Sequence, residues 1–181
     1  MIREDIKNKL LRWSEPYDEV KCDYFDESTN CLFVDAWKRN DVEEEGETVA
    51  VVFPNGKVFY ADGVEMNSVL LKIAVSTAKS RMKVLRDYKE FEKKNGVAPT
   101  YAHVNWYWKD NDEMPFKHVI KIEPDTDNAE NNPEDDEIAF YVPNIYALMQ
   151  LISPTYDIIS EENCGEDFYI TGVEMFSTTL H

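Results

Sequence analysis

Few residues in this sequence have the types and spacing that chemistry requires. Asp125-Thr126-Asp127-Asn128 begins like a calcium-binding loop, and Asp136 stands at its twelfth position. However, Ala129 occupies a position that should supply a ligand, and Glu130 stands where the sharp turn needs glycine. We therefore interpret the segment as a solvated run of charges and predict no metal ligand in it.

The histidines and cysteines also fail to define a site. His103 and His118 fall on two predicted strands that can pair, but the alternation along them does not establish a shared face. Cys164 has no identifiable histidine partner for nucleophilic catalysis. The chain has only six glycines, and none forms a phosphate-binding or dinucleotide-binding loop. The sequence therefore predicts no catalytic residue, no cofactor and no metal ligand.

The aromatic run Trp106-Tyr107-Trp108 has the composition of a surface on which bases stack. Single-strand binding proteins place such aromatics in a basic groove, and only three lysines lie nearby in this sequence. We interpret the two tryptophans as core residues. Tyr107 lies on the polar face of its strand and is the predicted contact residue.

The net charge limits the partners that this chain can attract. The 181 residues carry a formal charge of −17, which repels nucleic acids and acidic membranes and attracts basic proteins. No apolar run approaches the ~18 residues of a membrane span, and residues 1–5 lack the apolar core of a signal peptide. Three cysteines, an odd number, argue against a disulfide framework. We expect a cytoplasmic protein without direct nucleic-acid or membrane binding.

One long helix, over about 64–95, is the element around which the chain is organised. Its apolar residues recur at spacings of three and four; they are Leu71, Ala74, Val75, Ala78, Met82 and Leu85. Asp62 and Glu65 form a capping box that predicts its start, with Asn67 or Ser68 as the alternative. Gly96 follows two lysines and predicts its end.

The other face of this helix is basic. Lys72, Lys79, Arg86 and Lys93 recur every seven residues, and Arg81, Lys83 and Lys89 lie beside them. Tyr88 and Phe91 lie off the apolar stripe near the C-terminal end. We predict that this half of the helix binds a partner or a second copy of the chain, through Lys79, Arg86, Tyr88, Phe91 and Lys93.

Two hairpins are predicted before the helix. Residues 20–25 pair with 31–36, in a register that sets Phe25 opposite Cys31, so that Val20, Cys22 and Tyr24 share one face. Residues 49–53 and 57–61 flank Pro54-Asn55-Gly56, which is typical of a type I turn with a glycine bulge. Both faces of this second hairpin are apolar, which predicts strands covered on two sides.

The remaining elements follow from alternation and from helix boundaries. Strands are predicted over residues 100–108, 116–123, 138–142 and 168–178, the last bent at Gly172. Short helices are predicted over residues 2–13 and 145–152, the second capped by Asn144. The fold class is therefore α+β: a single domain over residues 1–181 with an antiparallel sheet of about six to eight strands and the long helix packed on it. The alternative is a sheet that closes into two layers.

Residues 123–137 are expected to form an acidic flexible loop. Within it, Glu134, Asp135, Asp136 and Glu137 are the predicted acidic contacts. We expect a non-enzymatic binding domain that docks a basic partner, as an inhibitor, an immunity-type antidote or a DNA mimic does. The first alternative is a structural or homo-oligomeric subunit, with a homodimer as one possibility, that uses the long helix as its interface. The second is an enzyme, which a pocket with converging titratable groups would favour.

Overall fold

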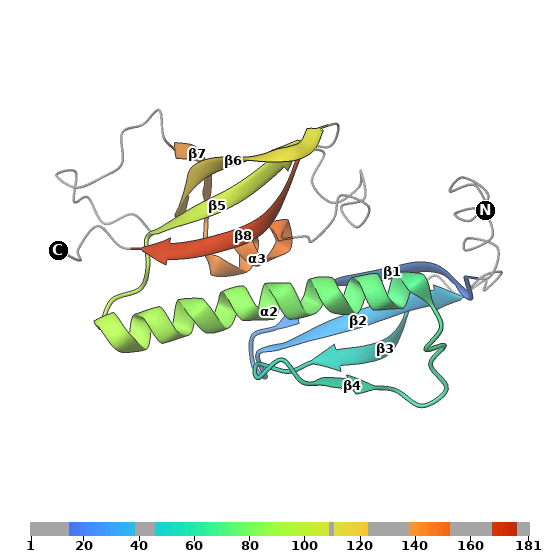
Figure 1. The fold of residues 1–181 in the computed structure, drawn as a ribbon. Helices are drawn as coiled ribbons and strands as arrows, with labels where there is room; N and C mark the ends of the chain where they lie inside the picture. The colour runs from blue at the N-terminus through green and yellow to red at the C-terminus, as the bar shows by residue number, and fades with distance from the viewer. Residues whose placement is uncertain (1–14, 39–45, 109–110, 123–137, 153–167, 177–181) are drawn as a thin grey trace, which may run out of the picture. The chain divides into compact units, whose positions relative to one another are not determined.

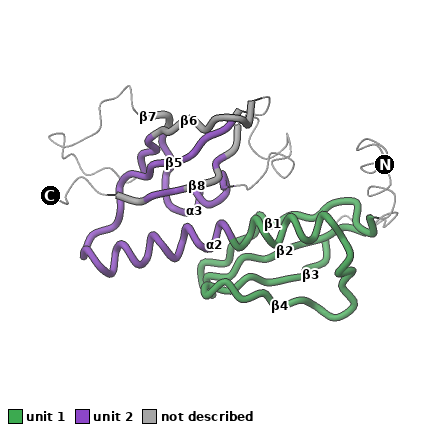
Figure 2. Tube along the Cα trace, in the orientation of Figure 1, with its two compact units in different colours: residues 1–79 green, residues 80–181 purple. Residues whose placement is uncertain are grey.

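The computed structural model describes residues 15–38, 46–108, 111–122, 138–152 and 168–176, and these contain eight strands and two helices. The strands form two sheets of four, so the α+β class is confirmed and the expectation of one continuous sheet is wrong. The chain divides into two compact units, Met1–Lys79 and Ser80–His181 (Figure 2). Two units that share a helix can belong to one domain or to two, so the single domain stays a prediction. The predicted helix over residues 2–13 lies outside the described residues.

The sheet of unit 1 is an antiparallel meander in which neighbours in sequence are neighbours in space (Figure 1). Its strands are β1 (Tyr17–Asp26), β2 (Cys31–Lys38), β3 (Glu47–Val52) and β4 (Val58–Tyr60). The turn between β3 and β4 is the predicted one. Phe53 and Lys57 are joined by a 2.9 Å backbone hydrogen bond, and Gly56 has a φ of 85°, which glycine adopts without strain.

The predicted register of β1 and β2 is confirmed at one end of the pair and wrong at the other. Val20 pairs with Ala36 and Lys21 with Asp35, as predicted, but a bulge between Lys21 and Tyr24 shifts the rest by one residue. Tyr24 therefore pairs with Phe33 and does not share a face with Cys22. Cys22 is buried and forms no disulfide bond, as predicted for a small hydrophobic residue.

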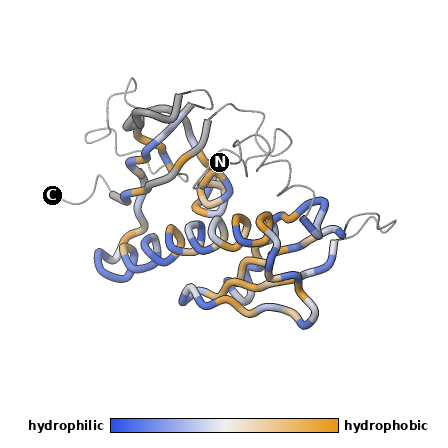
Figure 3. Tube along the Cα trace, turned by 45° about the vertical axis from the view of Figure 1, so that its right-hand side comes forward, coloured by the Kyte–Doolittle hydropathy of each residue, from blue (hydrophilic) through white to orange (hydrophobic). Residues whose placement is uncertain are grey.

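Helix α2 (Val69–Asn95) supplies the other half of the core of unit 1. Its N-terminal half lies along the sheet, and hydrophobic residues recur along both (Figures 1 and 3). The buried residues are Cys22, Leu32, Val34, Ala50 and Val52 from the strands and Leu71, Ala74, Val75 and Ala78 from the helix. The predicted apolar stripe is thus confirmed.

The expectation that the β3–β4 hairpin is covered on two sides is wrong. Val52 is fully buried, but Phe59 is 65% exposed and Phe53 is 40% exposed. The physical reason is that β4 is an edge strand and only one face of the sheet meets the helix. Apolar residues on both faces of a strand therefore did not indicate two covering layers here.

Helix α2 begins at the alternative start, after Ser68, and the capping box at Asp62 is not used. The Ser68 hydroxyl accepts a 3.0 Å hydrogen bond from the Leu71 N–H. Glu15, which precedes β1, brings a buried carboxylate to the same helix end. Its Oε2 accepts hydrogen bonds from the N–H groups of Val69 (2.9 Å) and Leu70 (3.2 Å), while its Oε1 accepts from the Ser68 hydroxyl. All three leading N–H groups therefore have acceptors.

Unit 2 contains a mixed sheet in the order β7-β6-β5-β8. Its strands are β5 (Tyr101–Trp108), β6 (Asn111–Ile122), β7 (Ile138–Val142) and β8 (Phe168–Phe176). β5 pairs antiparallel with β6 and β8, whereas β6 and β7 are parallel. The predicted strands are present, but the sheet is not built only of antiparallel hairpins.

Short helix α3 (Ile145–Leu151) begins as predicted, because the Asn144 side chain accepts a hydrogen bond from the Ala147 N–H. Its C-terminal end is satisfied by Arg81 of α2. The guanidinium donates from Nε to the Ile152 carbonyl (3.1 Å) and from Nη2 to the Gln150 carbonyl (3.0 Å). Arg81 was predicted on the basic surface of the helix, and it is instead only 5% exposed. The physical reason for its burial is that the carbonyl groups at the end of a helix, which have no acceptor role within the helix, stabilise a cation.

We predict that Glu15→Ala lowers the free energy of unfolding by about 2 kcal/mol, because partly buried N–H groups at the start of α2 lose a charged acceptor. Glu15→Gln should lose about half of that amount, since the amide keeps an acceptor oxygen but lacks the charge. Urea unfolding followed by circular dichroism measures both variants. Asp18→Ala removes an exposed carboxylate nearby and should change stability by less than about 0.5 kcal/mol. Equal effects at both positions would contradict the capping role.

We also predict that Arg81→Met destabilises the protein by about 2–3 kcal/mol, because one buried and one partly buried carbonyl lose their donor. Arg81→Lys should recover less than half of the loss, since one ammonium cannot reproduce the fork of the guanidinium. Lys83→Met is the matched control, because the Lys83 side chain is 66% exposed in its pair with Asp87. It should cost less than about 1 kcal/mol. A fully stable Arg81→Met variant would disprove the role of Arg81.

Candidate functional site

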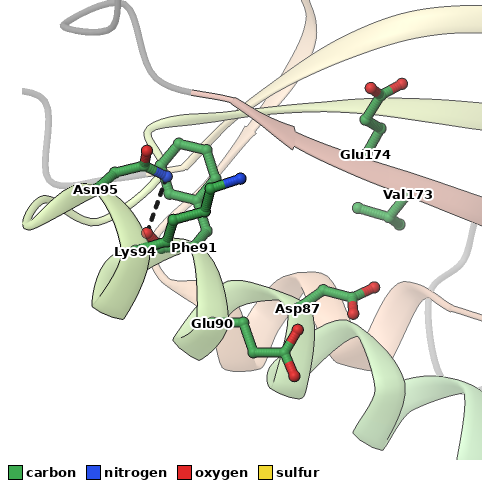
Figure 4. A pocket seen from close by; sticks show the side chains of 7 residues that line it. All are labelled: Asp87, Glu90, Phe91, Lys94, Asn95, Val173 and Glu174. Carbon is green, nitrogen blue, oxygen red and sulfur yellow. Dashed lines mark hydrogen bonds between the residues drawn. The ribbon is translucent and has the colours of Figure 1, made fainter.

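An open groove lies in unit 2 between the C-terminal half of α2 and strand β8 (Figure 4). It has a volume of about 480 Å³. The helix contributes Asp87, Glu90, Phe91, Lys94 and Asn95, and the strand contributes Val173 and Glu174. The groove is the candidate site because it gathers charged groups from segments far apart in the sequence.

The positions of these residues follow from helix and strand geometry. Asp87 is followed by Glu90 and Phe91 at three and four residues, and Lys94 follows these two at four and three, so all four lie on one face of α2. Val173 and Glu174 are consecutive in β8 and extend from opposite sides of the strand (Figure 4). The groove consequently combines two apolar side chains with charged groups.

The groove has more acidic than basic side chains, but its carboxylates do not converge on one point. The lining residues carry three carboxylates and one ammonium, that of Lys94. The Asp87 carboxylate also pairs with Lys83, with 2.8 Å between Oδ2 and Nζ. In Figure 4 the carboxylate of Glu174 points away from those of Asp87 and Glu90. Acid–base catalysis requires such groups to converge on one reacting atom, so the arrangement suits the binding of a charged partner better.

Two of the predicted contact residues lie at or near this groove. Phe91 lines it and is half-buried. Tyr88 is half-buried too, and burial raises the pKa of its phenol, with further contributions from the charge of Glu92 and from Tyr146 of α3. The interpretation of the C-terminal half of α2 as a contact region is a proposal that these positions support.

The other predicted residues are not brought into the groove. Lys79 and Lys93 are exposed and Arg86 is half-buried, and none lines it. Tyr107 is half-buried in β5. Residues 134–137, with their four predicted acidic contacts, lie outside the described residues. In the ladder of β5 and β6, His103 pairs with Val119 and His118 pairs with Val104, so the two histidines are not paired with each other.

Sequence reasoning missed most of the groove. Asp87, Glu90 and Lys94 repeat at helical spacing beside Phe91, and this pattern was available as a signal. Val173 and Glu174 carried no such signal, because the sequence does not show that β8 returns to pair with β5.

A second surface lies on the sheet of unit 1, on the face opposite Leu32 and Val52. Four residues in direct register cross all four strands there, and we call them the aromatic row: Tyr24, Phe33, Val51 and Phe59. The rings of Tyr24 and Phe33 have centroids 5.4 Å apart, and Tyr24 is 60% exposed. Exposed apolar residues that are contiguous mark interaction surfaces more often than scattered ones do.

Comparison with known proteins adds no assignment: no protein-family model, no curated protein and no solved structure matches this chain. The described residues contain no group of three or more His, Cys, Asp or Glu side chains placed to hold a metal ion. No helix in the described part of the chain is long and apolar enough to cross a membrane.

The raised pKa of Tyr88 generates a prediction for alkaline pH. Its phenol should ionise above the usual value of about 10, and Glu92→Gln should shift this ionisation toward that value. Because the folded state holds the proton more tightly, the contribution of Tyr88 to stability is present below the ordinary pKa and is lost as the pH rises through the folded pKa. Carbon-13 NMR of labelled tyrosine rings, with Tyr88→Phe for assignment, measures the shift. An ordinary pKa for Tyr88 would contradict the burial of its hydroxyl.

Proposed function

We propose that this chain is a protein-binding domain that docks a basic partner through the groove between α2 and β8. The observation that carries the proposal is the excess of carboxylates over ammonium groups along an open groove with apolar side chains. The charge of the whole chain, −17, supports it because it draws basic proteins from a distance.

The groove has the mixed character of a protein contact surface. Phe91 and Val173 offer apolar surface, whereas Asp87, Glu90 and Glu174 offer charges to a partner. The Lys83–Asp87 pair is exposed and therefore weak, so a cation from a partner can replace Lys83 at little cost. Charge pairs of this exposed kind set association rate and partner choice more than affinity.

A second candidate function is that of a structural or homo-oligomeric subunit. It is favoured by the aromatic row, which differs from the helix surface that the sequence predicts as the interface. Phe59 and Tyr24 at its two ends are more than half exposed, and a second copy of the sheet could cover them. The charge of −17 on each copy opposes such an association, so we rank it second.

The test compares the wild type with a groove variant that carries Asp87→Asn, Glu90→Gln and Glu174→Gln. Basic proteins retained from a lysate by the wild type are identified, and the affinity of each purified partner is then measured. We expect the groove variant to bind about tenfold more weakly, because three exposed charge pairs contribute roughly 0.2–1 kcal/mol each. The association rate should fall from low to physiological salt, over which the Debye length shortens from about 30 Å to about 8 Å.

The matched control changes the net charge by the same amount elsewhere. Asp18→Asn, Glu27→Gln and Glu47→Gln alter exposed carboxylates of unit 1 and should leave the affinity unchanged. If both variants lose the same amount of affinity, the effect depends on net charge alone, and a role for the groove is contradicted. If light scattering instead shows a dimer that Phe59→Ser dissociates, the second candidate is favoured.

A further inference from the structure

We infer that the partner binds as an extended basic segment that adds a strand to the free edge of β8. This inference rests on the proposed function and specifies the form of the partner. It starts from the position of β8 at the end of its sheet, where β5 is its neighbour in the order of strands.

Among the described residues, the edge of β8 that faces away from β5 is contacted near its N-terminal end and has no strand paired with it further along. Ile170 forms an isolated parallel bridge with Ile152, which covers the N-terminal part of the edge. The register with β5 shifts between Asn105 and Trp106, so that Gly172 and Ile170 pair with these residues and the strand bulges at the residue between them. The groove lies beyond this bulge, at Val173 and Glu174.

Some backbone groups of β8 point away from β5 at this position. In an antiparallel pair, alternate residues direct both N–H and C=O away from the neighbouring strand. One residue of the pair Val173 and Glu174 therefore presents both groups to the groove side of β8. Within the described residues, no backbone hydrogen bond joins either of them to α2. An edge of this kind pairs readily with an extended chain.

The dimensions and the chemistry of the groove fit a short strand. From Asp87 to Asn95 the helix covers roughly 12 Å, which accommodates about three or four residues of extended chain. Alternate side chains of such a chain would face opposite sides. Side chains directed toward α2 would meet the carboxylates of Asp87 and Glu90 and the ring of Phe91, so long cationic side chains with apolar stems fit there.

Charge complementarity also decides between a foreign segment and a second copy. Two copies would bring carboxylates to carboxylates, and each copy carries a charge of −17. A basic segment relieves this repulsion and supplies ammonium groups to the groove. We therefore assign the free edge to a basic segment of another protein.

The experiment uses the full chain and a labelled peptide, Lys-Val-Lys-Val-Lys-Val, with fluorescence anisotropy at low salt. The control peptide has the same sequence and charge, but every backbone nitrogen is methylated, so it cannot donate hydrogen bonds to an edge strand. We expect the control to bind at least tenfold more weakly. Hydrogen exchange followed by NMR should show slower exchange at the amide of Val173 or Glu174 with the first peptide and no slowing with the second.

The outcomes separate the inference from the proposed function. Equal binding of both peptides, weakened alike by Asp87→Asn with Glu90→Gln, overturns strand addition and leaves a basic partner in place. No binding of either peptide to the wild type overturns both. Slow exchange at β8 that needs no peptide and increases with protein concentration overturns the inference in favour of a second copy.

Discussion

The first N–H groups of a helix cannot find acceptors within the helix, and the structure depends on how α2 meets this constraint. Glu15 supplies a buried carboxylate from the residues before β1, and thereby ties the entry to the sheet of unit 1 to the start of the helix. The same helix then supplies Arg81 to the free carbonyls that end α3. The Glu15 carboxylate compensates the positive end of the α2 dipole, and the Arg81 guanidinium compensates the negative end of the α3 dipole. Each unit therefore has one charged side chain that satisfies a helix end, and both contacts involve α2.

Local patterns predicted much of the fold. The turn at Pro54-Asn55-Gly56 and the cap at Asn144 depend on a few adjacent residues, and both are present. The apolar stripe of α2 was equally readable, because its spacing follows from the helix itself. The burial of Glu15 and Arg81 could not be predicted. A charged residue that is buried against a distant helix end has the same local sequence context as a solvated one.

The candidate site was predicted only where it depends on one element. Phe91 was identified because it lies off the apolar stripe of α2, and it does line the groove. The partners of Phe91 on β8 depend on pairing between distant strands, which a single sequence does not reveal. The displacement of Tyr24 has a similar cause, since one bulge moved it from the face that it was predicted to share with Cys22 into an exposed row.

The position of β8 in the chain also has a kinetic consequence. The sheet of unit 1 joins strands that follow one another in sequence, so each closing loop is short and costs little entropy. β8 is the last strand in the order of elements, yet it pairs with β5, across the intervening β6, β7 and α3. High sequence separation slows folding, so we expect this pairing to be the slow step. The groove exists only once the step is complete, and the capacity to bind would therefore report that folding has finished.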